Sequence, residues 1–253
     1  MPIFDSHAHY LSDAFDEDRQ EVLSRLFADK VCGIIEAGTT ADSSRKALAL
    51  AEQFPHLWAA VGIHPEEAAT ATEADLNTLR TLAQHEKAVA IGEIGLDYHY
   101  EEYCPRDTQQ YWFRRQLELA REVSLPVVIH DREAHEDTLK LLQEFKPRGV
   151  VHCFSGSVEM AREVVKLGMY IGIGGVVTFK NARKLVEVAA EIPLDRLLLE
   201  TDAPYLAPVP YRGHRCDSSM IELTAATIAA LRGISTDEIL DIAVHNTRTL
   251  YSL

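Results

Sequence analysis

The pair His7 and His9 is the first feature of the sequence that could bind a metal ion. The two histidines close a short apolar segment that begins at Ile3 and has the pattern of a β-strand. Side chains two residues apart on a strand point to the same side, so both imidazoles can face one ion. In a chain with 11 histidines this spacing alone is weak evidence, and its position at a strand end makes it a candidate.

Other predicted strands also end in ionisable side chains. Glu93 closes the fourth strand, His130 the fifth and His152 the sixth, and Asp202 follows the eighth. A buried parallel strand is normally apolar, and a lone ionisable group costs several kcal/mol of stability there unless it is paired or binds a metal. Two divalent ions would compensate the carboxylates of Glu93 and Asp202 and leave the site positively charged. The pattern therefore predicts a dinuclear metal site that accepts an anionic substrate.

Each of these residues also has a simpler interpretation. Any one of His64, His130 and His152 is more often a strand-end histidine that bonds to the backbone. Glu93 and Asp202 could be turn residues. These interpretations do not explain why the whole set falls at the ends of strands one, four, five, six and eight.

The elements that must position these side chains alternate along the whole chain. Short β-rich segments are followed by segments of helical period, which is typical of βα units around a parallel sheet. The eight expected strands begin near Ile3, Val31, Trp58, Ala88, Pro126, Gly149, Tyr170 and Arg196. A mean spacing of about 28 residues suits one strand, one helix and two short loops. Residues 1–253 are therefore predicted to form a single (β/α)8 barrel, in preference to a doubly wound open sheet.

Three segments support this assignment. Arg106–Val123 has apolar residues at intervals of three and four, which predicts a helix packed on the sheet. Ser235 and Glu238 have capping-box spacing and open a last helix that is expected to close the barrel. The proline-rich segment 203–210 is expected to form an ordered loop over the carboxyl ends of the strands, where barrel enzymes have their active sites.

Composition excludes several classes of protein. The chain has 25 Lys and Arg against 39 Asp and Glu, a net charge of −14, so a broad basic surface for nucleic acid is excluded. No apolar run approaches the roughly 18 residues of a membrane helix. The N-terminus does not resemble a secretory signal, and the four cysteines lack CxxC spacing. We expect a cytoplasmic protein with no membrane contact and no obligate protein partner, with Cys153 in the core because strand side chains alternate.

Six segments resemble, in order, the motifs of the TatD family of metal-dependent hydrolases, relatives of the amidohydrolase superfamily. They read DSHAH, GIHP, GEIGLDY, PVVIH, HCFSG and ETDAPY, at residues 5–9, 62–65, 92–98, 126–130, 152–156 and 200–205. The resemblance extends over the chain from end to end. Six ordered motifs are much more specific than any one of them.

The resemblance implies a (β/α)8 barrel that binds two divalent cations. The implied ligands are His7, His9 and Asp202 for one ion, His130 and His152 for the other, and Glu93 for both. His64 is similar to a family histidine that lies near the scissile group and is not a standard ligand. Family members are described as deoxyribonucleases, often 3′ exonucleases, and some relatives are proposed to deacylate D-aminoacyl-tRNA.

One stretch departs from the family pattern. Family members commonly carry a sequence like RGxRNEP after the eighth strand, whereas residues 212–218 of this chain read RGHRCDS. The predicted metal ligands are untouched. The departure therefore bears on substrate preference and loop geometry.

Our hypothesis from the sequence is hydrolysis of phosphodiesters, with DNA ends as the first candidate substrate. The two ions, whether Zn²⁺, Mn²⁺, Mg²⁺, Fe²⁺ or Ni²⁺, would activate a water, with Glu93, Asp202 and His64 as the catalytic residues. Asp202 would accept the proton of that water. The residues expected to hold phosphate are His64, Arg132, Lys180 and Arg212. So few cationic side chains imply a short, single-stranded footprint.

The sequence leaves two alternatives open. The same metal centre could hydrolyse an ester, a lactone or a phosphotriester, or deacylate D-aminoacyl-tRNA, because barrel chemistry varies with the loops. The chain could also be a binding or scaffold protein with a structural metal. The mixed histidine and carboxylate set disfavours this second alternative, since structural zinc sites are usually closed and rich in thiolates.

Overall fold

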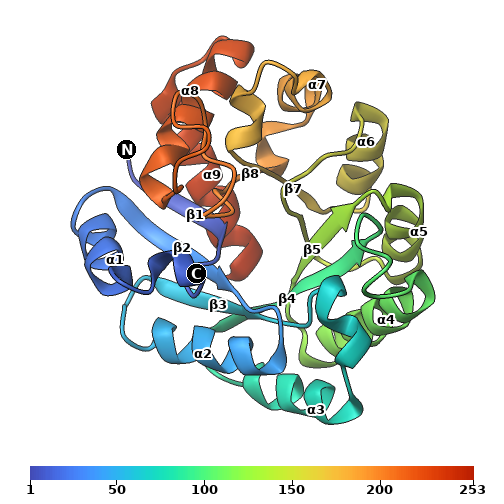
Figure 1. The fold of residues 1–253 in the computed structure, drawn as a ribbon. Helices are drawn as coiled ribbons and strands as arrows, with labels where there is room; N and C mark the ends of the chain where they lie inside the picture. The colour runs from blue at the N-terminus through green and yellow to red at the C-terminus, as the bar shows by residue number, and fades with distance from the viewer.

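The computed structural model describes all residues 1–253 and shows eight parallel strands in a nearly closed barrel, surrounded by helices (Figure 1). Neighbours in the sheet follow chain order. The strands are β1 (Ile3–Ala8), β2 (Val31–Ala37), β3 (Leu57–Val61), β4 (Ala88–Asp97), β5 (Val127–Arg132), β6 (Gly149–Val151), β7 (Tyr170–Ile173) and β8 (Leu197–Leu199). The predicted barrel is confirmed, and every strand begins within one residue of its expected position.

Nine α-helices pack around the strands. They are α1 (Arg19–Ala28), α2 (Ala41–Ala51), α3 (Glu73–Leu82), α4 (Arg106–Val123), α5 (His135–Phe145), α6 (Val158–Lys166), α7 (Arg183–Glu191), α8 (Ile221–Arg232) and α9 (Thr236–Tyr251). Five short 3₁₀ helices, η1 to η5, lie at Asp13–Phe15, Pro65–Thr70, Gly175–Thr178, Leu194–Arg196 and Ser218–Met220. None of the helices combines the length and the apolar character needed to cross a bilayer.

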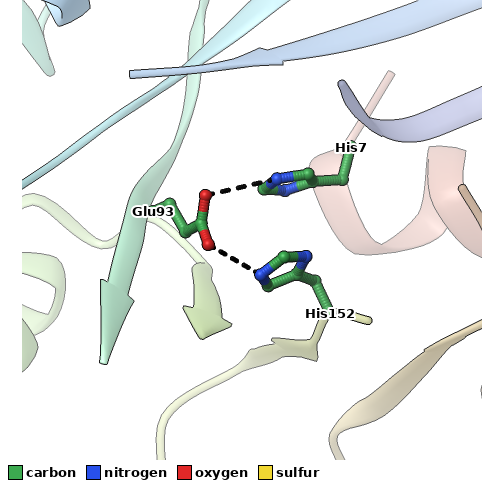
Figure 2. Close-up of side chains that lie close together, drawn as sticks. All are labelled: His7, Glu93 and His152. Carbon is green, nitrogen blue, oxygen red and sulfur yellow. Dashed lines mark ion pairs between the residues drawn. The ribbon is translucent and has the colours of Figure 1, made fainter. Parts of the chain in front are cut away.

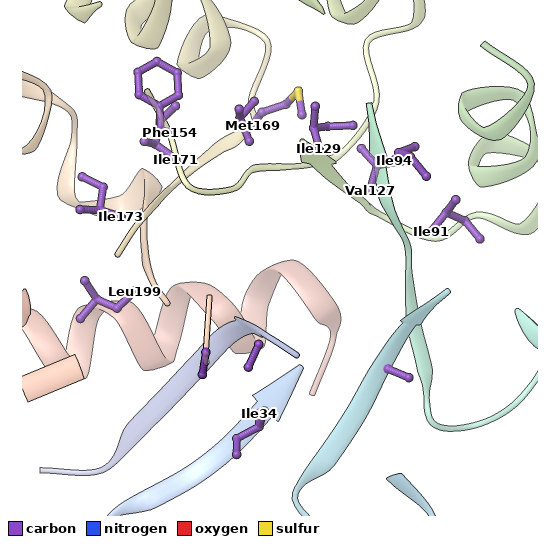
Figure 3. Packing of buried hydrophobic residues seen from close by; sticks show 14 of the residues in the cluster. Ile34, Ile91, Ile94, Val127, Ile129, Phe154, Met169, Ile171, Ile173 and Leu199 are labelled. Atoms are coloured by element: carbon purple, nitrogen blue, oxygen red, sulfur yellow. The ribbon is translucent and has the colours of Figure 1, made fainter. Parts of the chain in front are cut away.

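Side chains on the two faces of the strands form two apolar layers. The outer faces pack against the helices, and Figure 3 shows part of this layer, including Ile129 of β5 and Ile171 of β7. The inner faces fill the barrel, where Phe4 of β1 stacks on Trp58 of β3 with ring centroids 5.7 Å apart. Because both faces are buried, the strands are apolar along most of their length, and most of their polar residues lie towards the carboxyl ends, with Asp5 of β1 as an exception.

The last helix closes the barrel where the backbone ladder is interrupted. β1 and β8 share no ladder, and a single bridge joins Ala8 to Ala203. α9 packs against both strands at this seam (Figure 1). Its Asn246 amide donates to the carbonyls of Leu194 and Leu197, both at 2.8 Å. The predicted capping box of Ser235 and the closing role of this helix are confirmed.

Asp5 joins β1 to the segment that follows β8. Its carboxylate is fully buried and accepts hydrogen bonds from the backbone N of Thr201 at 3.0 Å and from the hydroxyls of Thr201 and Ser218, both at 2.6 Å. Burial raises the pKa of Asp5 to about 6, although the hydrogen bonds from Ser218 and Thr201 oppose this shift. Asp5 therefore fixes the position of the strand end that carries His7.

We expect Asp5→Ala to lower the free energy of unfolding by about 2 kcal/mol or more, because several buried donors lose their acceptor. Urea unfolding followed by circular dichroism measures this change. Asp241→Ala, on the exposed face of α9, is the matched control and should leave the midpoint almost unchanged. Equal midpoints for the two variants would show that Asp5 does not stabilise the seam.

Candidate metal centre

The carboxylate of Glu93 lies at the centre of the rim, and its two oxygens face different histidines. Oε2 is 3.3 Å from Nε2 of His7 and 3.3 Å from Nε2 of His9. Asp202 Oδ1 lies on the same side, 3.7 Å from His7 and 3.5 Å from His9. The two imidazole Nε2 atoms are 3.0 Å apart, so both rings point to one place, as the spacing of His7 and His9 predicts.

The other oxygen of Glu93 faces three further histidines. Oε1 is 2.7 Å from Nε2 of His152, 2.8 Å from Nδ1 of His130 and 3.4 Å from Nε2 of His64. Figure 2 shows Glu93 between His7 and His152, whose rings are stacked with centroids 3.9 Å apart. One buried carboxylate therefore connects two halves of the site.

The backbone at the rim brings these side chains together. Gly95 has φ of 147°, and a Cβ there would lie 2.0 Å from the carbonyl oxygen of His130. Only glycine lets β4 and β5 approach so closely beside Glu93. On the other side, the backbone N of Asp202 donates to the His7 carbonyl at 3.1 Å, and Asp202 itself has φ of 63°. These contacts aim the Asp202 carboxylate at the histidine pair.

The protonation states of His7, Glu93 and Asp202 suit metal ligands. Burial, and then the charge of His152, lowers the pKa of His7 to about 4, so the ring is neutral at pH 7. Burial raises the pKa of Glu93, but the surrounding histidines outweigh it and hold this pKa well below its usual value. Burial raises the pKa of Asp202, but the hydrogen bond from His9 and the charges of the nearby histidines together outweigh it and lower this pKa. The centre thus offers ionised carboxylates and a neutral imidazole.

The ligand atoms form three overlapping groups, each with its atoms within 4.8 Å of one another. The groups are His7, Glu93 and His152; His7, His9 and Asp202; and His64, Glu93 and His130. Imidazole nitrogens and carboxylate oxygens in this arrangement fit divalent cations such as Zn²⁺, Mn²⁺, Fe²⁺ and Ni²⁺. The grouping differs in part from the implied one, because His152 lies with His7 and His64 lies with His130.

A cavity of about 970 Å³ opens over this centre. Its wall includes Arg132 and the predicted site residues His9, His64, Glu93, His130, His152 and Asp202. Lys180 and Arg212 do not belong to the wall: Lys180 is exposed, and the Arg212 guanidinium lies 4.4 Å from the ring centroid of Phe179. A contact of these two residues with substrate stays a prediction.

Comparison with known proteins gives the same assignment along the whole chain. The sequence profile of the family described as TatD related DNase matches residues 4–252. The chain belongs to the TatD family. A Bacillus subtilis relative named uncharacterized metal-dependent hydrolase YabD is 44% identical over 99% of both chains. The 3′-5′ ssDNA/RNA exonuclease TatD of Erwinia tasmaniensis is 36% identical over 99% of this chain and all of its own.

A solved structure supports both the family and the fold. The crystal structure of YJJV, a TatD homologue from Escherichia coli K12, superposes with a TM-score of 0.93 and 34% identity, over 99% of this chain and 98% of the homologue. The present chain is therefore a metal-dependent hydrolase of the TatD family, a class of enzyme that acts on ester bonds.

Two acidic residues of this TatD-family site were not predicted from the sequence as site residues. Asp97 Oδ2 is 3.0 Å from Nε2 of His130, so this ring lies between two carboxylates. Glu200 is fully buried, accepts a hydrogen bond from the backbone N of Cys153, and lies 3.9 Å from Nδ1 of His152. Both belong to segments that resemble family motifs, which was the one signal in the sequence that marked them.

The prediction that Cys153 belongs to the core is wrong. Cys153 is half-buried and contributes to the wall of the cavity. β6 ends at Val151, and Cys153 has φ of 43°, so the alternation of strand side chains does not extend to this residue. The physical reason is thus an early strand end, which the apolar pattern did not reveal.

The segment that departs from the TatD pattern, residues 216–218, contacts β1 and the loop after β8 and so supports the site from outside the cavity. The backbone N of Cys216 donates to the Pro204 carbonyl at 2.9 Å, and Asp217 accepts from the backbone N of Ser219 at 3.0 Å as the cap of η5. Ser218 donates to Asp5 and lies 2.7 Å from the hydroxyl of Tyr10. These contacts hold the loop in place, and none of these departing residues belongs to the cavity wall.

We expect Glu93→Gln to weaken binding of Mn²⁺ or Zn²⁺ at least about tenfold, since even the substitution of residues that only hydrogen-bond to metal ligands lowers metal affinity by about this factor. Isothermal titration and elemental analysis measure the affinity and the bound ions. Asp131→Asn is the matched control, because the Asp131 oxygens are occupied by His135 at 2.7 Å and Thr138 at 3.2 Å. Equal metal binding by both variants would reject Glu93 as a ligand.

Metal binding should release protons. Burial opposes the protonation of His9 and His130, but their carboxylate neighbours outweigh it: the pKa of His9 lies well above its usual value, and that of His130 is about 10. A cation must displace these protons at pH 7, so affinity should rise between pH 6 and 8, up to about tenfold per unit for each proton. Titration heats in two buffers of different ionisation enthalpy measure the release. Equal heats would contradict it.

Proposed function

We propose that this TatD-family hydrolase removes nucleotides from the 3′ end of single-stranded DNA with two divalent cations. The observation that carries the proposal is the position of Glu93, whose two carboxylate oxygens face separate sets of histidines. Relatives such as the Erwinia tasmaniensis protein are named 3′-5′ ssDNA/RNA exonucleases, which supports this substrate class.

In the proposed centre, six side chains would hold the two cations. His7, His9 and Asp202 would hold one cation, His130 and His152 the other, and Glu93 would contribute to both. Bound cations would lower the pKa of an attacking water and stabilise the negative charge that develops on the phosphate. His7 and His9 lie at Oε2 of Glu93, and His130 and His152 lie at Oε1, which supports this division although His152 also lies close to His7.

Two residues would act on the reacting groups themselves. Asp202 is ionised, and its carboxylate is partly exposed at the mouth of the cavity, so it can accept the proton of the attacking water. His64 Nδ1 accepts from the backbone N of Glu66 at 3.3 Å, so Nε2 is the nitrogen that carries the ring proton. Nε2 faces the centre and can donate to a phosphate oxygen.

The charges on the wall favour a short footprint. Arg132 is the only lysine or arginine that lines the cavity, while Asp13, Glu66 and Glu67 lie on the same wall. A long strand would therefore meet repulsion beyond the metal centre. Lys180 and Arg212, outside the wall, would contact only the next phosphates.

An assay with single-stranded DNA labelled at the 3′ or the 5′ end tests this function in Mg²⁺, Mn²⁺ and Zn²⁺. We expect loss of the 3′ label first, stepwise shortening, and no reaction in EDTA. Asp202→Asn should lower kcat at least about 100-fold without loss of the fold. RNA of the same sequence and p-nitrophenyl esters are run beside the DNA. Intact DNA in every metal, or hydrolysis of the esters alone, would reject the nuclease function.

A further inference from the structure

Tyr205 is an exposed aromatic residue on the wall of a cavity that is lined mostly by polar residues. Its side chain is 56% exposed, and it lines the same cavity as Glu93 and Asp202. The ring has no aromatic neighbour, no cation over its face and no hydrogen bond to its hydroxyl. A large apolar surface left uncovered beside an active centre is available to a ligand.

The loop that carries Tyr205 is held firmly. The backbone N of Tyr205 donates to the Asp202 carbonyl at 2.9 Å, and the carbonyl of the preceding Pro204 accepts from Cys216 at 2.9 Å. After Tyr205, the Leu206 carbonyl packs closely against Gly175: a Cβ added to this glycine would lie only 2.3 Å from the carbonyl oxygen. The backbone that carries the ring is therefore in place before a ligand arrives, which lowers the entropy cost of binding.

The other tyrosine on the wall is already covered. Arg132 lies 5.0 Å from the ring centroid of Tyr100, and Tyr103 packs against the same ring at 6.0 Å. Tyr100 thus belongs to a packed cluster on the β5 side of the cavity. Tyr205, on the β8 side next to Asp202, is the aromatic residue of the wall with a free face.

We propose that Tyr205 stacks on an unpaired nucleobase next to the scissile phosphodiester. This inference rests on the proposed nuclease function and adds to it the residue that binds the base. Stacking needs no positive charge, tolerates every base and requires a base that is not covered by a partner strand. Tyr205 would therefore give an acidic protein affinity and a preference for single strands.

Three variants separate stacking from other roles of this loop. Tyr205→Ala removes the ring and Tyr205→Phe keeps it. Tyr211→Ala is the matched control, because Tyr211 lies in the same loop with 49% exposure but does not line the cavity. Thermal unfolding checks that each variant is folded.

The substrates are three single-stranded oligonucleotides: one with all bases, one abasic at the 3′-terminal position and one abasic at the penultimate position. On the complete strand, Tyr205→Ala should raise KM about tenfold and change kcat little, while Tyr205→Phe and Tyr211→Ala stay within about twofold of the wild type. On one of the two abasic strands, Tyr205→Ala and the wild type should have the same KM. This strand identifies the stacked base.

A binding measurement gives a second readout. 2-Aminopurine is placed at the identified position of a strand whose terminal linkage is a phosphorothioate. Its fluorescence should be quenched by the wild type and by Tyr205→Phe, and not by Tyr205→Ala.

Two results would overturn the inference while the nuclease function stands. One is a Tyr205→Ala protein with the KM of the wild type, and the other is a KM increase of the same size on all three oligonucleotides. A wild-type protein that neither binds nor cleaves any of the strands would instead reject the nuclease function, and the inference with it.

Discussion

The buried carboxylate of Glu93 is the group around which the rest of the site is arranged. It lies in the middle of β4 with five imidazoles within 3.4 Å of its oxygens. A lone carboxylate at this depth would be strongly unfavourable, and the surrounding histidines both compensate its charge and are oriented by it. The parallel barrel makes this possible, because the carboxyl ends of all its strands meet at one rim. The proposed binding of cations uses the same geometry.

Under the proposed function, this centre explains how an acidic protein can act on an anionic substrate. The net charge of −14 and the acids on the cavity wall exclude recognition by a basic surface. Under the proposed function, the cations provide the local positive charge, and the free ring of Tyr205 adds affinity that does not depend on charge. Asp202 is one of the proposed cation ligands, and Tyr205 follows it in the same loop. Both contributions therefore act at one place on the cavity wall, and the footprint is short.

The seam between β8 and β1 connects the fold to the site. No ladder joins these strands, so α9, Asp5 and the segment 216–218 hold them together, along with a few backbone hydrogen bonds at residues 202 and 203. The same segment anchors the loop that presents Asp202 and Tyr205. The positions that depart from the family sequence therefore support the active-site loop and do not line the cavity.

The sequence by itself determined the barrel, the starts of its strands and the convergence of His7, His9, Glu93 and Asp202 on one rim, because the alternation of strands and helices and the two-residue period of a strand are local properties. The tertiary structure decided which ligands group together, since this depends on how neighbouring strands approach. Asp97 was missed because glycines interrupt β4 before its true end, and Cys153 was misplaced because β6 ends early. The direction of loop side chains could not be predicted from local sequence either, because long-range packing decides loop conformation. Arg132 and Tyr205 face the cavity, whereas Arg212 lies on Phe179.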